Sequence, residues 1–135
     1  MKKTKWWLRV VGVFYLLLTL MNLYFLFFSD LNVFRDTLPF PADALAIRAF
    51  ADAWMVFIFE LGVLGGMMLY ASRQPAKSGI LVLTVIMAEV FRGVIADGIW
   101  ILRGYSAASY IPFIIVHLII IGTGILFLRQ EHRTT

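Results

Sequence analysis

The stretch VVGVFYLLLTLMNLYFLFFS, residues 10–29, contains no charged side chain. A helix needs roughly 20 predominantly apolar residues to cross about 30 Å of hydrocarbon, so this stretch alone is long enough to span a bilayer. The rest of the chain suits the same solvent, because 61% of its 135 residues are hydrophobic and only 15% are charged. That balance is too apolar for a soluble surface and indicates an integral membrane protein.

Breaks in hydropathy predict four spanning helices in a single domain that covers residues 1–135. We expect them at about residues 6–28, 45–70, 78–102 and 109–128. The longest connection contains Pro39 and Pro41, which stop helix continuation. The other two connections are short hairpin links, which make neighbouring helices antiparallel. The sequence therefore predicts an all-α fold, a transmembrane four-helix bundle with antiparallel neighbours.

Basic residues near the ends of these spans are distributed unevenly. If both termini lie inside, the cytoplasmic side holds Lys2, Lys3, Lys5, Arg9, Arg73, Lys77, Arg129 and Arg133. The other side then holds Arg35 and Arg103, with Arg48 at its boundary. Because cytoplasmic segments are enriched in Lys and Arg, we predict a multi-pass membrane protein with cytoplasmic N- and C-termini. Basic residues spread in this way form no single stripe, so we expect no nucleic-acid partner.

Polar and ionisable residues inside the predicted spans form the candidate ligand-binding site. Near the midplane lie Glu60, Glu89, Arg92 and His117, and nearer the outer surface lie Asp52, Asp97, Arg48 and Asn22. A central Asp or Arg costs about 2.5 to 3.5 kcal/mol on insertion scales, so these groups should face one another or water. Helical spacing supports one polar seam on each helix, such as Tyr15, Asn22 and Ser29 on the first span. We predict a deep site and an outer mouth.

The predicted interior is short of positive charge. Four carboxylates face two arginines and one histidine: Asp52, Glu60, Glu89 and Asp97 against Arg48, Arg92 and His117. A dry interior would protonate one or more carboxylates, while a wet one could hold a cation or a cationic ligand. A structural reading stays open beside the functional one, because Glu89 and Arg92 stand at i, i+3 and can form an ion pair that fixes helix register.

The sequence contains few of the residues that usually hold metals and cofactors. The chain has no cysteine, which excludes iron–sulfur clusters, thiolate metal sites and c-type haem attachment. A single deep histidine does not make a metal site or a bis-histidine haem site, so we expect no metal and no cofactor. The spacing of Gly62 and Gly66 is a GxxxG pattern, which serves either packing within the bundle or formation of a homo-oligomer.

Three segments carry a resemblance to a known family. They are KWWLRVVGVFY at residues 5–15, RAFADAW at residues 48–54 and AEVFRGVIAD at residues 88–97. With them, nearly the whole chain resembles the BphX-like family of small bacterial membrane proteins. That family is associated with gene clusters for the degradation of biphenyl and related aromatics, and its biochemical function is not established. The resemblance implies an inner-membrane setting and transfers no catalytic residue.

Three functions are compatible with these features. We expect a small-molecule-binding or transport-accessory protein, linked through the resemblance to aromatic catabolism, whose ligand is small and either hydrophobic or cationic. No nucleophile motif, phosphate loop or metal-ligand spacing is present, so we expect no enzymatic activity. The alternatives are a membrane-embedded acid–base enzyme of the isomerase type and an oligomer that conducts protons or cations.

Overall fold

The computed structural model describes residues 2–132, and every regular element in that range is helical. Four helices are long and apolar enough to cross a membrane: Lys2–Phe28, Ala44–Ala71, Gly79–Leu102 and Ala107–Gln130. The predicted all-α fold and the four predicted helices are therefore confirmed. They indicate a membrane protein. Arg133, which belongs to the count of basic residues, lies outside the described residues.

The first two spans are α1 (Lys2–Phe28) and α2 (Ala44–Ala71). The third consists of α3 (Gly79–Ala88), η3 (Glu89–Ile95) and α4 (Ala96–Leu102) in continuous succession, and α5 (Ala107–His132) is the fourth. Two short 3₁₀ helices lie in the connections, η1 (Leu31–Thr37) after α1 and η2 (Pro75–Lys77) after α2. The sequence reasoning treated both segments as plain loops.

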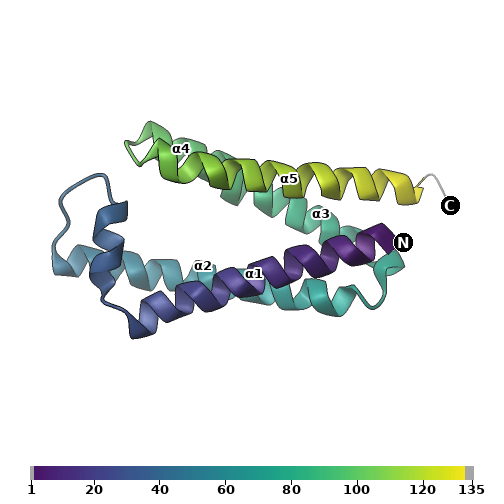
Figure 1. Cartoon of the computed structure of the whole chain (residues 1–135), viewed down its shortest axis with the longest axis horizontal. Helices are drawn as coiled ribbons and strands as arrows, with labels where there is room; N and C mark the ends of the chain where they lie inside the picture. Colours follow the sequence, from purple (N-terminus) through teal and green to yellow (C-terminus); the bar gives the residue numbers. More distant parts are fainter. Residues whose placement is uncertain (1, 133–135) are drawn as a thin grey trace.

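Figure 1 shows two antiparallel helix pairs, α1 with α2 and the third span with α5. The chain begins and α5 ends at the same end of the molecule, which we call the terminal end. There the Lys3 ammonium lies 3.2 Å from the Gln130 side-chain oxygen. The opposite end, the η1 end, holds η1 and the link between α4 and α5. Which of the two ends faces the cytoplasm stays a prediction.

Glycines set the close approach of α1 and α2. A Cβ added to Gly12 would lie 3.0 Å from the carbonyl oxygen of Gly65, and one added to Gly65 would lie 3.0 Å from that of Gly12. Gly62 similarly faces Thr19. Gly66, the second glycine of the GxxxG pattern, meets nothing within 4 Å. Packing within the bundle therefore uses Gly62 and Gly65, and homo-oligomer formation stays a prediction.

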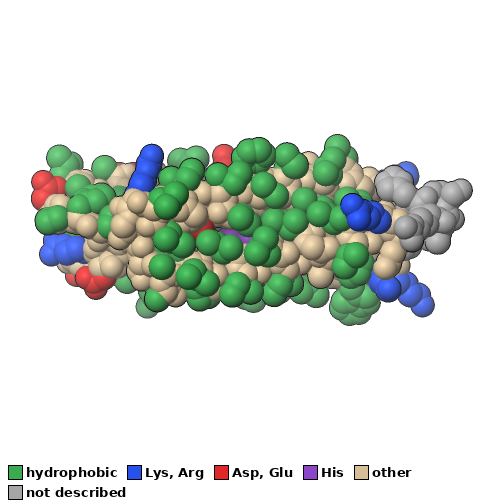
Figure 2. Space-filling model, turned by 90° about the horizontal axis from the view of Figure 1, so that it is seen from above, with side chains coloured by type: hydrophobic (Ala, Val, Ile, Leu, Met, Phe, Trp, Pro, Cys, Tyr) green, Lys and Arg blue, Asp and Glu red, His purple; other side chains and the backbone are tan. Residues whose placement is uncertain are grey.

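The two helix pairs meet through α1 and α5. The Trp7 indole nitrogen donates to the Thr123 hydroxyl over 3.0 Å, and Gly124 leaves room for both Trp7 and Ile86. The buried apolar core extends from this contact along the bundle through Leu8, Val11, Leu61, Met68, Val82, Val85 and Ile120. The outside remains apolar between charged ends, as Figure 2 shows for one face. This is the pattern expected where lipid takes the place of water.

The long connection at the η1 end contains two capped helix starts. Asp30 caps η1, and hydrogen bonds from the Asn32 backbone and then from its side-chain amide lower the pKa of Asp30. Asp43 caps α2 through a 2.8 Å hydrogen bond from the Ala46 N–H. Carboxylates in these positions satisfy backbone donors that the helix leaves free, so the long connection is folded and positions the neighbouring ends of α1 and α2.

Candidate functional site

The third span changes its helical geometry in its middle. It is α-helical in α3, π-helical over η3 and α-helical again in α4. Such π-helical turns frequently occur at functional sites. Gly93 lies within η3, and a Cβ added there would lie 2.6 Å from both Cδ2 and Nδ1 of His117. The missing side chain at Gly93 therefore makes room for the His117 ring, which projects from α5.

Glu89 is the centre of the polar interior, with 1% of its surface exposed. Its Oε2 lies 2.5 Å from Nδ1 of His117. Its Oε1 accepts a hydrogen bond from the Tyr15 hydroxyl and lies 3.6 Å from a guanidinium nitrogen of Arg92. One carboxylate thus connects α1, the third span and α5. Three polar partners offset the cost of burying its charge.

His117 has a carboxylate on each side of its ring. Nδ1 faces Glu89, and Nε2 lies 3.5 Å from Oδ2 of Asp97. Within residues 2–132, the buried Oδ2 of Asp97 has no hydrogen-bond partner, and the His117 ring nitrogen lies 3.5 Å from it. An imidazolium donates from both ring nitrogens and would serve both carboxylates. We call Tyr15, Glu89, Arg92, Asp97 and His117 the acid–base cluster.

The charge of this cluster depends on one proton. When His117 is protonated, the two cations His117 and Arg92 balance the two carboxylates Glu89 and Asp97. When His117 is neutral, one negative charge is in excess. Asp52 and Glu60 are exposed and lie outside the acid–base cluster. The shortage of positive charge inferred from the sequence is therefore reduced, within the cluster, to the one charge that a proton on His117 supplies.

Arg92 links the cluster to the other helix pair. Its guanidinium lies 5.4 Å from the centroid of the Tyr15 ring on α1 and 5.1 Å from that of Phe57 on α2. Contacts of a guanidinium with ring faces are attractive, more so where water is excluded. The Glu60 side chain on α2 is exposed. Of the predicted deep residues, the structure brings Glu89, Arg92 and His117 together and leaves Glu60 at the edge.

Aromatic side chains continue from Phe57 towards the η1 end. Successive ring centroids lie 4.6 to 6.3 Å apart. The rings belong to Phe50, Trp54, Phe57, Trp100, Tyr105 and Tyr110, which we call the aromatic layer. Asn22 is held at this layer, where its side-chain oxygen accepts a 3.1 Å hydrogen bond from the Trp54 indole. The layer connects α2 with α4 and α5 beside the acid–base cluster.

The structure shows a contact that the predicted division into a deep site and an outer mouth did not include. Asp97 was expected in the outer mouth, but its carboxylate joins the deep cluster through His117. The reason is geometric: Glu89 and Asp97 lie on the same side of the third span, and the imidazole is long enough to reach both. The prediction used only the position of each residue along its helix axis, which takes no account of the length of the histidine side chain.

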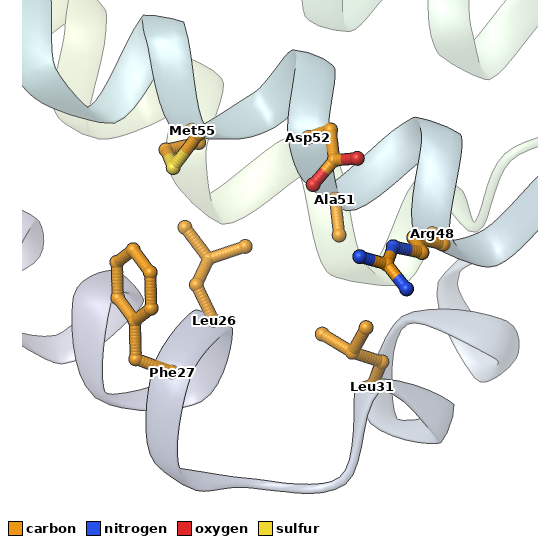
Figure 3. A pocket seen from close by; sticks show the side chains of 7 residues that line it. All are labelled: Leu26, Phe27, Leu31, Arg48, Ala51, Asp52 and Met55. Atoms are coloured by element: carbon orange, nitrogen blue, oxygen red, sulfur yellow. The ribbon is translucent and has the colours of Figure 1, made fainter.

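The remaining outer residues, Arg48 and Asp52, line a separate pocket of about 190 Å³ at the η1 end. Its apolar walls come from the end of α1, the start of η1 and α2: Leu26, Phe27, Leu31, Ala51 and Met55. Figure 3 shows the guanidinium and the carboxylate among these side chains. The expected mouth is thus divided between this pocket, the aromatic layer and the deep cluster.

Tyr15 is the one cluster member that the sequence reasoning did not place among the site residues. It is 1% exposed and donates to Glu89. The available signal was the spacing of Tyr15, Asn22 and Ser29 on one seam of the first span. A tyrosine in the middle of a span is weak evidence on its own, because its ring packs equally well in an apolar core.

No group of three or more His, Cys, Asp or Glu residues within residues 2–132 is arranged to hold a metal ion. The carboxylates of Glu89 and Asp97 instead approach opposite nitrogens of His117. A metal would need these groups to converge on one point, whereas here each ring nitrogen already faces a carboxylate. The arrangement suits proton chemistry better.

Comparisons with a family model and with individual proteins point to the same family. The model of the BphX-like family matches residues 1–133. Uncharacterized BphX-like proteins of Burkholderia cepacia and of Paraburkholderia xenovorans (strain LB400) are each 28% identical to this chain over 133 residues, which cover 93% of the chain and 90% of each relative. No solved structure matches significantly. With a match over practically its whole length, the chain belongs to the BphX-like family.

Proposed function

We propose that this protein binds a small aromatic molecule carrying a weakly acidic group, such as a carboxylic acid or a phenol, within the bacterial inner membrane. The observation that carries the proposal is the environment of His117. Its ring lies between two buried carboxylates, yet 21% of its side chain is exposed. The protein would act as a binding or transport-accessory component that exchanges a proton with its ligand.

The surface over the cluster supports access from the apolar side. Midway along the molecule, Figure 2 shows a small area of purple (His) and red (Asp or Glu) atoms among green hydrophobic side chains. A lipophilic molecule in the bilayer can reach this exposed area without passing through water. A polar group on that molecule would gain hydrogen bonds that hydrocarbon does not supply.

The aromatic layer supports the chemical class of the ligand. Trp54 and Trp100 have ring centroids 6.3 Å apart, and Tyr110 lies 5.4 Å from Trp100. Aromatic rings pack favourably against one another in offset or edge-to-face geometry, so this region suits a ring-containing ligand. A link to aromatic catabolism, as the family resemblance implies, would fit this chemistry.

Proton transfer within the bundle is a second candidate, favoured by one specific observation. Tyr15, Glu89, His117 and Asp97 follow one another as a chain of ionisable groups across three spans. The isomerase alternative would require a substrate cavity of roughly 300 Å³ or more beside its acid and base. The pocket of about 190 Å³ at Arg48 and Asp52 is smaller than this, and no residue of the acid–base cluster lines it.

The test is a ligand titration of the protein in nanodiscs of phosphatidylcholine. Biphenyl, biphenyl-4-carboxylate and 4-phenylphenol are added while tryptophan fluorescence is recorded, since Trp54 and Trp100 lie in the aromatic layer. We expect saturable quenching by the acid and the phenol, and a weaker response to the hydrocarbon. A pH-indicator dye should record proton uptake or release on binding.

Two variants probe the cluster, and a third variant outside the cluster serves as the control. Glu89→Gln and His117→Gln should abolish the proton signal and weaken saturable quenching, whereas Glu60→Gln should retain both. Circular dichroism checks that each variant remains helical. Quenching that never saturates in the wild type, or that is identical in both cluster variants and the wild type, would refute the proposal. Acid-driven proton flux into liposomes without any ligand would support the second candidate instead.

A further inference from the structure

The pocket at the η1 end contains two opposite charges that are not paired with each other. Within residues 2–132, neither Arg48 nor Asp52 takes part in a hydrogen bond or a salt bridge. Both side chains are exposed, and both line the same concave surface. Figure 3 shows them on successive turns of α2, opposite Leu26 and Leu31. A pocket of this kind presents a donor and an acceptor to whatever occupies it.

The position of the pocket along α2 indicates its environment. The 28 residues of α2 span about 42 Å at a rise of about 1.5 Å per residue, which matches a bilayer including its headgroups. Arg48 and Asp52 then lie roughly 6 and 12 Å from the start of the helix at Ala44. Arg48 therefore lies near the boundary between headgroups and acyl chains, and Asp52 lies about 6 Å deeper, where an unpartnered carboxylate is costly.

The size and walls of the pocket narrow the class of occupant. About 190 Å³ is less than the roughly 300 Å³ of ordinary ligand pockets, so the pocket can hold a headgroup but not a whole lipid. Leu26, Phe27 and Met55 form an apolar side, on which the first part of an acyl chain can lie. The ligand must therefore be amphipathic.

From these observations we infer that the pocket binds the headgroup of a zwitterionic phospholipid with a primary ammonium, namely phosphatidylethanolamine. Arg48 would bind the phosphate, since guanidinium groups match phosphate oxygens in geometry and charge. Asp52 would accept hydrogen bonds from the ammonium. An anionic headgroup would satisfy Arg48 alone and place its negative charge beside Asp52, so the pair favours a zwitterion over an anion. This site lies apart from the acid–base cluster and does not depend on the proposed function.

The experiment compares lipids that differ only in headgroup. The protein is exchanged into detergent with equal amounts of phosphatidylethanolamine, phosphatidylglycerol and phosphatidylcholine of identical acyl chains, and retained lipid is counted by native mass spectrometry. We expect phosphatidylethanolamine to be retained over both others. Phosphatidylcholine has the same phosphate, but its quaternary ammonium has no N–H to donate to Asp52.

The variants of Arg48 and Asp52 should change lipid retention in different ways. Arg48→Gln should lower retention of phosphatidylethanolamine by about tenfold, the value of one charge-assisted hydrogen bond. Asp52→Asn should reverse the headgroup preference, because it removes the partner of the ammonium and the repulsion of an anion, and phosphatidylglycerol should then be retained best. Arg103→Gln and Asp36→Asn change exposed charges at the same end outside the pocket and should leave the preference unchanged.

Three results would overturn the inference. The first is equal retention of all three lipids by the wild type, as expected for a lipid shell without a headgroup site. The second is a headgroup preference that Asp52→Asn does not alter. The third is complete displacement of the lipid by an equal concentration of free phosphoethanolamine, which would assign the pocket to a soluble ligand. None of these measurements involves Glu89 or His117, so their outcome is separate from that of the aromatic-ligand titration.

Discussion

The acid–base cluster and the η1-end pocket contain similar residue types in opposite circumstances. In the cluster, Glu89 is 1% exposed and has three polar partners. In the pocket, Arg48 and Asp52 are exposed and, within the described chain, unpaired. The polar contacts of the cluster connect α1, the third span and α5. The pocket leaves its charges available to another molecule.

This difference shows that charge inside a predicted membrane span has two separate meanings. A charge that is buried and paired contributes to the register and contacts of the helices, and removing one partner leaves the other without compensation. A charge that is exposed and unpaired contributes little to folding and points to a ligand or a lipid. Substitutions in the two regions test whether they divide in this way.

Glu89→Ala should have the largest effect on stability. It leaves His117 and Arg92 without their shared carboxylate, and breaking a buried ion pair from one side costs about 3 to 5 kcal/mol. We expect a lowered unfolding midpoint when the protein in mixed micelles is titrated with sodium dodecyl sulfate. Glu60→Ala is the control, because Glu60 is exposed on α2. Equal losses in the two variants would contradict the distinction between buried and exposed charge.

Tyr15→Phe removes a single hydroxyl from the cluster and keeps the ring that lies beside Arg92. A hydrogen bond to a charged group contributes about 1.5 to 3 kcal/mol, so we expect a loss in that range in the same titration. Tyr24→Phe is the matched control, since the Tyr24 side chain is 59% exposed on the same helix. A Tyr15 variant as stable as the wild type would show that the hydroxyl does not hold α1 to Glu89.

Gly93→Ala tests the room made for the histidine ring. The added methyl group would overlap His117, and overpacking of this kind costs about 1 to 3 kcal/mol. Gly98→Ala is the control in the same span, because a Cβ there meets nothing within 4 Å. Thermal unfolding in detergent should separate the two variants, with Gly98→Ala equal to or above the wild type, since alanine favours a helix over glycine. The reverse order would contradict the placement of His117 on Gly93.

Arg48→Gln and Asp52→Asn should have the smallest effect on stability. Substitutions of exposed side chains without partners usually change stability very little. We expect unchanged unfolding midpoints in lipid-free detergent, while headgroup retention changes as described above. A large stability loss in lipid-free detergent would mean that these two charges hold the bundle together, and would remove the contrast with the cluster.

Much of the fold was predictable from the sequence because a bilayer imposes simple requirements. A spanning helix has to be predominantly apolar for about 20 residues, so the four spans are visible as long, mostly apolar runs. The prolines at positions 39 and 41 and the short links mark where they end. The folding of the long connection into η1 was not visible, because its cap depends on a local bond between Asp30 and Asn32.

Four of the five members of the acid–base cluster were among the predicted site residues, but their contacts with one another could not be predicted. Ionisable residues within spans are so costly that Glu89, Arg92 and His117 stand out by type alone, whereas Tyr15 does not.

The sequence by itself determined that this chain is a four-helix membrane protein with charges that need partners, since hydropathy and charge are properties of the residues. Only the tertiary structure decided which partners they have. The π-helical turn and the space over Gly93 allow His117 to reach both Glu89 and Asp97, while the turn of the chain after α1 leaves Arg48 and Asp52 in a pocket of their own. Such contacts depend on how helices from distant parts of the chain meet, and no periodicity within one helix encodes them.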